Sequence, residues 1–286
     1  MTHPKKTILI AGCGDLGLRV AQNLLQQGHT VYGLRKEIPQ NRPPLQLNGN
    51  ALHWLPFDLC QTEASTPLLA NINDIVYCPA PGDRSEAAYQ HIYINGLRNL
   101  LTLLDTLFLR RVVFISSSAV YGEHRGEWVN ENTPLAPLGT GGRVLQEAEQ
   151  HVWQLPFETC VLRLAGLYGP EKQLLNERIR QGQATVPRHE KHYANRIHLE
   201  DAAAAVVHCL TLDKPAPCYI ASDDTPMGID ELYDWIATLL NAPAAQTGTA
   251  PAGIGNKRLD NSLLKQSGFR LRWPDTKQGY ASFLNK

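Results

Sequence analysis

A serine cluster and the loop after it carry the side chains in this sequence that are best suited to chemistry. The run VVFISSSAVYGEHR places Ser117, Ser118, Tyr121 and His124 directly after an apolar stretch. A serine hydroxyl can orient a reacting oxygen, and an imidazole can exchange protons near neutral pH. The tyrosine hydroxyl is a second candidate for proton transfer. Each residue also has a structural alternative, because strand-end serines often cap backbone groups and loop histidines are often only solvated.

A glycine pattern near the start of the sequence predicts a dinucleotide site. In ILIAGCGDLGLRV, Gly12, Gly14 and Gly17 stand between an apolar run and a segment with helical periodicity. Such glycines allow a tight turn, close approach to a pyrophosphate, and close packing of helix on strand. The helix amino terminus would then face the anion.

The residues after the next apolar run bear on the choice of cofactor. An acidic residue there would bind a ribose 2′-hydroxyl, whereas this chain has Arg35 and Lys36, which suit a 2′-phosphate. We therefore predict NADP, with NAD as the alternative. Asp58 ends the third run, where it is either an adenine contact or an ordinary loop aspartate. The predicted cofactor-binding residues are Gly12, Gly14, Asp15, Leu16, Gly17, Arg35, Lys36, Asp58 and Ala80.

The candidate site residues follow apolar runs that would form strands. These runs alternate with helical segments over the first 165 residues. This alternation predicts an α/β fold, a Rossmann-type doubly wound parallel sheet, with a smaller C-terminal substrate lobe. The predicted strands are 7–11, 30–34, 52–57, 74–78, 111–116, 160–165 and 218–222. Helices are expected near 16–25, 199–212 and 228–240, and polar loops at 188–196 and 243–255.

We assign the nucleotide-binding domain to residues 1–165 and about 196–225, and the substrate lobe to about 166–195 and 226–286. Charges balance, with 27 basic and 27 acidic residues, which favours neither nucleic acid nor a membrane as partner. The six cysteines form no CxxC pair, so we expect reduced thiols in a cytoplasmic protein and no metal site.

The sequence resembles the extended short-chain dehydrogenases/reductases, the NAD(P)-dependent sugar epimerases and dehydratases. The matching segments follow the order of that family across some two hundred residues: GCGDLG at 12–17, YINGLRNLL at 93–101, VVFISSSAVYG at 112–122, ENTPLAP at 131–137, LRLAGLYGP at 162–170 and RIHLEDAAAA at 196–205. The resemblance implies that Ser117 is the catalytic serine and that Asn95 organises the active-site helix. It also implies that a homodimer could form through the helices that carry Asn95 and residues 142–154.

One family motif is missing. The YxxxK pair belongs on the helix after ENTPLAP, where our alignment places Thr140 and Val144. A threonine hydroxyl is far too weak an acid to replace a tyrosine beside an ammonium, and valine carries no charge. Arg143 comes one residue before Val144, so its side chain would lie about 100° around the helix from the position of the missing lysine. Tyr121 or His124 would have to act instead, and the adjacent Gly141 and Gly142 would let cofactor or substrate approach the backbone closely.

Two functions therefore remain open. The first is an oxidoreductase or epimerase-like enzyme on a sugar or nucleotide-linked molecule, with Ser117, Tyr121 and His124 as catalytic candidates and Ser118 and Arg196 as substrate contacts. The substrate could be anionic, since Arg188, Lys191 and Arg196 lie in one polar segment. The second is a non-catalytic protein that senses NADP(H). The serine strand favours the enzyme, and the missing pair favours the sensor.

Overall fold

The computed structural model describes residues 4–38, 45–61, 69–251 and 253–284. It divides into two compact units that each combine three stretches of the chain. The first comprises Met1–Ser116, Val144–Leu162 and Ala203–Cys218, and the second comprises Ser117–Arg143, Arg163–Ala202 and Tyr219–Lys286. Residues 117–143 thus group with the second unit in space, whereas the sequence-based division placed them with the nucleotide-binding domain. That functional division stays a prediction.

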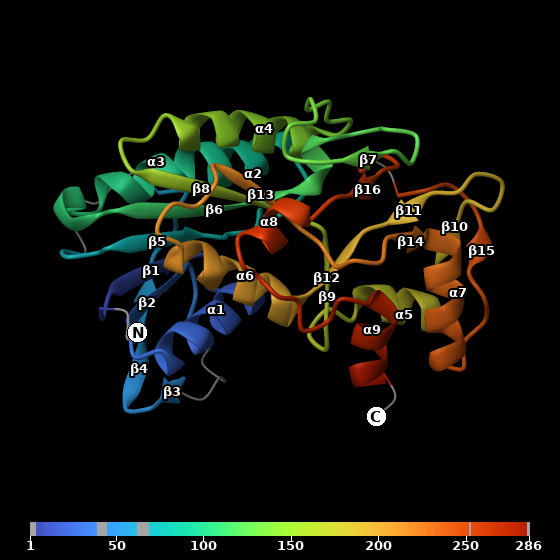
Figure 1. Ribbon diagram of the computed structural model, residues 1–286, viewed down its shortest axis with the longest axis horizontal. Coiled ribbons are helices and arrows are strands. Elements are labelled where there is room, and N and C mark those ends of the chain that lie inside the picture. The colour runs from blue at the N-terminus through green and yellow to red at the C-terminus, as the bar shows by residue number, and fades with distance from the viewer. Residues whose placement is uncertain (1–3, 39–44, 62–68, 252, 285–286) are drawn as a thin grey trace. The chain divides into compact units, whose positions relative to one another are not determined.

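The sheet contains eight strands and follows the order expected of a doubly wound fold (Figure 1). Its strands, in spatial order, are β13 (Cys218–Ala221), β8 (Glu158–Leu164), β6 (Arg111–Ser117), β5 (Asp74–Tyr77), β1 (Thr7–Ala11), β2 (Thr30–Arg35), β4 (Asn50–Pro56) and β3 (Gln46–Leu47). The pairs β4–β2, β2–β1, β1–β5 and β5–β6 are parallel. Strand β5 is buried at every position, including Asp74, whose carboxylate is paired with Lys6, and its other three residues are apolar or aromatic.

Helices cover both faces of this sheet. Figure 1 shows α1 (Asp15–Gln26) and α6 (Leu199–Thr211) on one face and α2 (Glu86–Gln90), α3 (Gly96–Thr102) and α4 (Thr140–Trp153) on the other. The apolar side of α1 buries Leu16, Val20 and Leu24 against the sheet. The doubly wound α/β prediction is therefore confirmed.

A buried arginine caps α6 inside the first unit. Arg111, at the start of β6, is inaccessible to solvent and donates to the carbonyls of Cys209, Leu210 and Asp213. Its other donors contact the Glu158 carboxylate, at 2.7 Å for Nη2. A guanidinium in this place satisfies helix-end carbonyls that would otherwise lack partners.

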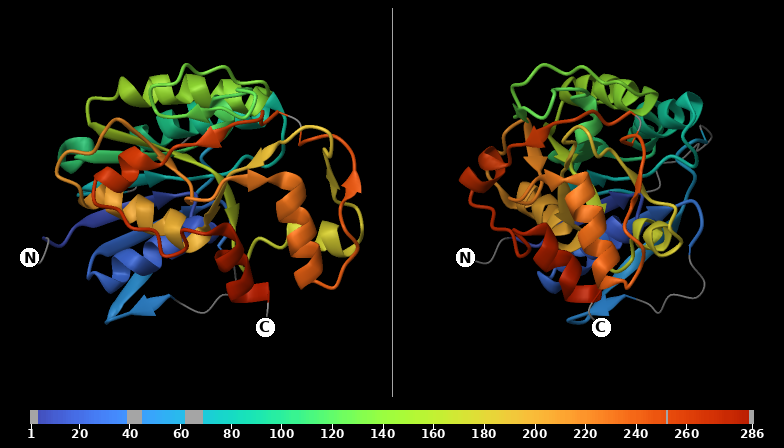
Figure 2. Two further views of the ribbon diagram at one scale, coloured as in Figure 1. Left: turned by 45° about the vertical axis from the view of Figure 1, so that its right-hand side comes forward. Right: turned by 90° about the vertical axis from the view of Figure 1, so that its right-hand side faces the viewer.

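Among the described residues, the second unit contains four short strand pairs and four complete helices. The pairs are β7 (Trp128–Val129) with β16 (Arg258–Leu259), β9 (Gly166–Tyr168) with β12 (Arg196–His198), β10 (Thr185–Val186) with β15 (Gln246–Thr247), and β11 (Tyr193–Ala194) with β14 (Met227–Gly228). The helices are α5 (Leu174–Arg180), α7 (Ile229–Leu239), α8 (Ser262–Gln266) and α9 (Thr276–Leu284). Helix α7 packs against α5 and α9 around an apolar core that includes Tyr168, Leu232 and Tyr280 (Figure 2).

Most predicted elements agree with the structure, but both predicted polar loops contain short strands. The segment 188–196 contains β11 and begins β12, and the segment 243–255 contains β15. These strands are two and three residues long, and each pairs with a segment remote in sequence. Local apolar periodicity therefore carried no sign of them.

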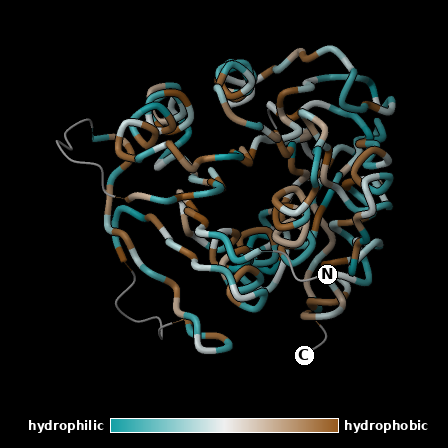
Figure 3. The backbone as a smooth tube through the Cα atoms, turned by 60° about the vertical axis from the view of Figure 1, so that its left-hand side comes forward, coloured by the Kyte–Doolittle hydropathy of each residue, from teal (hydrophilic) through white to brown (hydrophobic). Residues whose placement is uncertain are grey.

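Hydrophobic stretches along the backbone are short and interrupted by hydrophilic ones (Figure 3). Within the described residues, no helix combines the length and the apolar character that crossing a bilayer requires.

Candidate functional site

The glycine loop between β1 and α1 has the geometry of a pyrophosphate cradle. Gly12 has φ +86°, and a Cβ added there would lie 2.3 Å from the Pro79 backbone. A Cβ on Gly17 would lie 3.0 Å from Ile10, whereas one on Gly14 would meet nothing closer than 4.0 Å. The loop is anchored to β2, since the Gly12 and Cys13 amides both donate to the Leu34 carbonyl. The open side of Gly14 and the amino terminus of α1 thus fit a dinucleotide phosphate.

The remaining predicted cofactor residues lie in the same unit. Asp15 begins α1, Leu16 is buried beneath it, and Ala80 is exposed beyond the end of β5. Arg35 ends β2 and is half-buried, and within the described residues its guanidinium has no partner. This arrangement leaves the guanidinium of Arg35 available to an anion.

Lys36 is already paired. Its ammonium lies 3.0 Å from the Asp58 carboxylate, which also accepts from the Cys60 amide. That amide, followed by Lys36, holds the pKa of Asp58 below its usual value, and Asp58 in turn raises the pKa of Lys36. A 2′-phosphate would therefore have to compete with Asp58 for the lysine.

Asn95 ends a short stretch of π-helix between α2 and α3. The stretch covers His91–Asn95, and the buried Tyr77 hydroxyl donates to the Ile92 carbonyl within it. Such stretches interrupt the regular backbone ladder and occur frequently at functional sites. The structure thus shows an irregular helix at the position where the resemblance implies an organising asparagine.

The serine cluster ends β6 and begins a 3-10 turn over Ser118–Val120. The Ser117 hydroxyl oxygen accepts from the Ala119 amide at 3.2 Å, which is the capping role open to a strand-end serine. Its hydroxyl proton is still available to donate, because a serine oxygen can accept one bond while donating another. Ser118 is buried at 8% exposure.

Tyr121 is enclosed by the second unit. Its side chain is fully buried, and its hydroxyl accepts from Arg163 at 2.8 Å. The Arg163 guanidinium carbon also lies 5.0 Å from the centre of the tyrosine ring. The Tyr121 phenol thus accepts a hydrogen bond from a buried guanidinium, and its ring packs against the same cation.

His124 has a different environment. Its ring is half-buried, and Nε2 lies 3.0 Å from the Tyr121 carbonyl, which can only accept. Nε2 therefore carries the proton, and in the neutral ring Nδ1 is the proton acceptor. The His124 amide donates to the Asn256 carbonyl.

Helix α4 contains neither tyrosine nor lysine, and Thr140 is its first residue. Val144 is buried at 3% exposure, and Arg143 turns back to Thr140 and the Leu138 carbonyl. A Cβ on Gly142 would lie 2.8 Å from both the Ala119 oxygen and Pro137. Gly142 thus lets the helix pack against the serine turn, which is a different use from the approach of a ligand.

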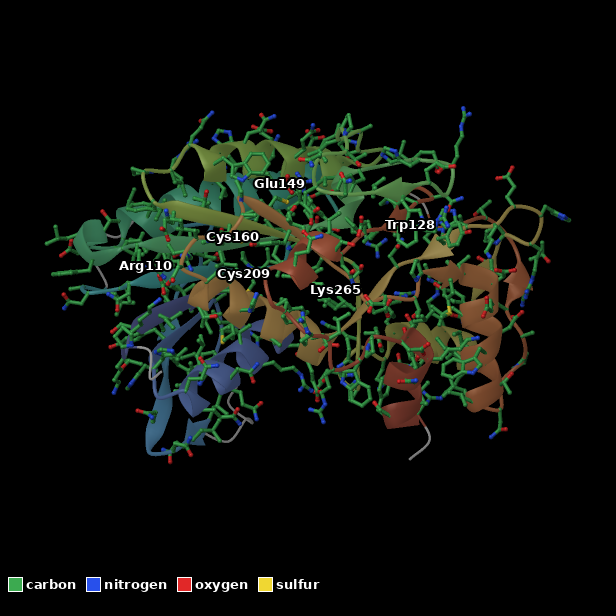
Figure 4. All side chains as sticks on the ribbon, viewed as in Figure 1. Arg110, Trp128, Glu149, Cys160, Cys209 and Lys265 are labelled. Atoms are coloured by element: carbon green, nitrogen blue, oxygen red, sulfur yellow. The ribbon has the colours of Figure 1, made fainter. Side chains whose placement is uncertain are left out.

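Further along α4, Glu149 is fully buried and accepts from the Ser116 hydroxyl at 2.6 Å. Figure 4 labels this glutamate on its helix. The bond fixes α4 to the strand that ends in Ser117.

The three basic residues of the 188–196 segment have separate partners. Arg188 binds Asp234 at 2.5 Å and the Ala245 carbonyl, and the Lys191 ammonium lies over the Tyr193 ring. Arg196 lies near Tyr233, Tyr280 and Asp223, and its inaccessible Nε has no partner within the described residues. Burial works to lower the pKa of Arg196, but these neighbours outweigh it and raise the pKa. The structure therefore gives no joint clamp of the three and leaves Arg196 as the one with an unsatisfied buried donor.

Sequence reasoning missed Asn256. Its backbone carbonyl accepts from His124 and Gly126, its amide donates to Glu123, and its side chain bonds Tyr193 and Lys191. Nothing local in GIGNKRL marks this role, because the asparagine meets these residues only through the fold.

Comparisons with known proteins place this geometry in a family. The model of the NAD dependent epimerase/dehydratase family matches residues 8–219. Protein YeeZ of Escherichia coli K12 is 28% identical over 279 residues, covering 94% of this chain and 97% of YeeZ.

Two solved structures extend the likeness over nearly the whole chain. A Methylobacillus flagellatus protein, provisionally described as a NAD-dependent epimerase/dehydratase, is 31% identical with a TM-score of 0.77 and 98% coverage of both chains. MoeE5, solved with UDP-glucuronic acid and NAD, shares the fold with a TM-score of 0.79 at 20% identity, covering 98% of this chain and 97% of its own. With the glycine cradle and the sheet order, these matches show that the chain belongs to the NAD dependent epimerase/dehydratase family.

Proposed function

We propose that this protein is a NADP-dependent epimerase-like oxidoreductase that acts on a nucleotide-linked sugar and uses His124 as its acid/base. The family match supports a nicotinamide cofactor, and the bound UDP-glucuronic acid of MoeE5 supports the substrate class. The observation that carries the proposal is the fixed imidazole of His124, whose Nε2 is held by the Tyr121 carbonyl.

His124 would remove the proton of a substrate hydroxyl through Nδ1. His124 lies seven residues after Ser117, whose hydroxyl would donate a hydrogen bond to the reacting oxygen. A bound nicotinamide would supply the hydride-transfer half of the reaction, while His124 would hold the proton removed from the substrate hydroxyl. His124 would return that proton to the substrate oxygen when hydride came back to the opposite face of the carbon, which would invert that centre with no net change in oxidation state.

Tyr121 has a structural role in this proposal. Its side chain is fully buried, so a substrate hydroxyl would reach the phenol only if the surrounding side chains moved. Ser118 and Arg196 are proposed to contact the substrate. The cationic guanidinium of Arg196, whose Nε has no partner among the described residues, supports an anionic group there, such as a diphosphate.

The cofactor preference rests on Arg35. Its guanidinium at the end of β2, which has no partner among the described residues, suits the 2′-phosphate of NADP, while Lys36 is held by Asp58.

The experiment is a titration with NADPH and NADH, followed by a screen of UDP- and dTDP-sugars at the reduced-nicotinamide absorbance band. We expect turnover that falls by about 10²–10⁴ in His124→Gln, the usual contribution of a positioned acid/base. The matched control is His189→Gln, since His189 is exposed and remote from the turn in sequence. Tight NADPH binding without turnover of any sugar would favour a sensor of NADP(H) instead.

A further inference from the structure

The turn that carries His124 is held by a segment more than one hundred residues later in the chain. Strand β16 pairs with β7 in parallel, and the Asn256 carbonyl accepts from the amides of His124 and Gly126, both at 3.0 Å. The Asn256 amide donates to the Glu123 carboxylate at 2.8 Å. Residues 254–259 therefore form one wall of the 121–126 turn.

Lys257 lies at the centre of this wall. Its side chain is 1% exposed, and its ammonium donates to the carbonyls of Gly122 at 3.3 Å, Gly255 at 3.5 Å and Ile254. Three carbonyls match the three donors of an ammonium. Asn195 fixes the backbone on either side, since it donates to the Lys257 carbonyl and accepts from the Leu259 amide.

The charges that face Lys257 come from two other segments. Glu123, on the turn itself, acts to keep the ammonium charged, and His192, next to β11, is the second titratable neighbour. Burial outweighs Glu123 and lowers the pKa of Lys257 to about 8. The lysine is thus charged at neutral pH but close to losing its proton.

A buried ammonium is a costly way to fill space. Removing an ion from water costs several kcal/mol before its contacts offset that cost, and an apolar side chain would avoid it. At this position the charged donor provides a hydrogen bond to the Gly122 carbonyl. That carbonyl follows directly after the Tyr121 carbonyl, which binds Nε2 of His124.

We propose that Lys257 is a positioning residue that fixes the Tyr121–Gly122 peptides and thereby orients the His124 imidazole. The inference deepens the proposed function and rests on it for its catalytic meaning. Its structural claim, that Lys257 controls His124, is tested without any turnover.

The test follows the His124 ring by NMR in full-length protein labelled with ¹³C at histidine Cε1, its resonance assigned with His124→Gln. In Lys257→Ala we expect the His124 resonance to move, because the Gly122 carbonyl loses its buried donor. Added n-propylammonium should restore the wild-type resonance, whereas n-propyltrimethylammonium, which cannot donate hydrogen bonds, should not. The control is Lys265→Ala, because Lys265 on α8 is a surface lysine paired with Asp224 (Figure 4).

An unchanged His124 resonance in folded Lys257→Ala would overturn the proposal, as would rescue by both amines. If that variant does not fold, the wild-type titration decides. The His124 resonance should then show a second inflection between about pH 7 and 9, as Lys257 loses its charge, and its absence overturns the proposal. Loss of turnover in His124→Gln is a separate result, so either proposal can fail alone.

Discussion

At the scale of single residues, the sequence indicated which residue types could form the candidate site. The role of each residue depends on the groups that it contacts in the folded chain. From the sequence, Ser117 was the serine that the family resemblance implies is catalytic, and Tyr121 was one of two candidates for proton transfer. The structure adds that Ser117 is partly exposed, whereas Tyr121 is fully buried against Arg163. Arg35 and Lys36 were likewise paired in sequence, yet only Lys36 is engaged by Asp58.

That difference makes a prediction about the cofactor. Arg35→Ala should weaken NADPH binding about 10-fold, a change of about 1.4 kcal/mol, and leave NADH binding nearly unchanged, because only NADPH has a 2′-phosphate. Asp58→Asn should tighten NADPH binding several-fold, since it frees Lys36. Calorimetric titration of both cofactors measures these changes, with Lys5→Ala as a control for a general loss of positive charge. Equal losses for both cofactors in Arg35→Ala would contradict the assignment of Arg35.

At the scale of elements, long strands and helices were predictable because their burial shows as local periodicity. Strands β1, β5 and β6 are apolar runs, and α1 carries a regular apolar face. The two- and three-residue strands could not be predicted from the sequence, since β9–β12 and β11–β14 form only through pairing between distant segments. The contacts of Asn256 and Lys257 were unpredictable for the same reason.

Helix α4 offers a test in which the expected sign is unusual. Alanine normally stabilises a helix relative to glycine by about 1 kcal/mol. Gly142→Ala should instead lower the free energy of unfolding by about 1–3 kcal/mol, because its Cβ would lie 2.8 Å from the Ala119 oxygen. Urea unfolding measures the change, and Gly82→Ala, where a Cβ would meet nothing within 4 Å, is the control. A stabilised Gly142→Ala would mean that α4 does not pack so closely on the serine turn.

At the scale of the whole molecule, the alternation of apolar runs with helical segments and the glycine pattern predicted the fold class. The interior of the second unit could not be predicted in this way. Its core includes a carboxyl group, Asp223, that is 2% exposed and accepts from the Thr276 hydroxyl and the Thr225 amide. Burial raises the pKa of Asp223 to about 7, and Asp275 and Asp224 add to the rise. No sequence pattern distinguishes this aspartate from its exposed neighbour Asp224.

This carboxyl predicts how stability depends on pH. The unfolded chain loses the Asp223 proton near about pH 4, whereas the folded protein keeps it to about pH 7. Between these values the folded state binds more protons, so its free energy of unfolding should fall as pH rises, by on the order of 3 kcal/mol. Asp223→Asn should remove this part of the pH dependence in urea unfolding at pH 5 and pH 8, and the exposed Asp213→Asn should not. Equal slopes in wild type and Asp223→Asn would refute the assignment.

The distribution of the thiols would give the molecule a native reporter of the cofactor site that we propose. Of the six cysteines, all in the described part of the chain, only Cys60 is exposed, and its amide binds the same Asp58 that holds Lys36. Burial, followed by Asp58, raises the pKa of the Cys60 thiol, so alkylation by a maleimide should be slow and should quicken as pH rises. A dinucleotide seated beside Asp58 would shield this sulfur. The rate of labelling at one natural cysteine therefore becomes a measure of cofactor occupancy that needs neither a substrate nor an engineered probe.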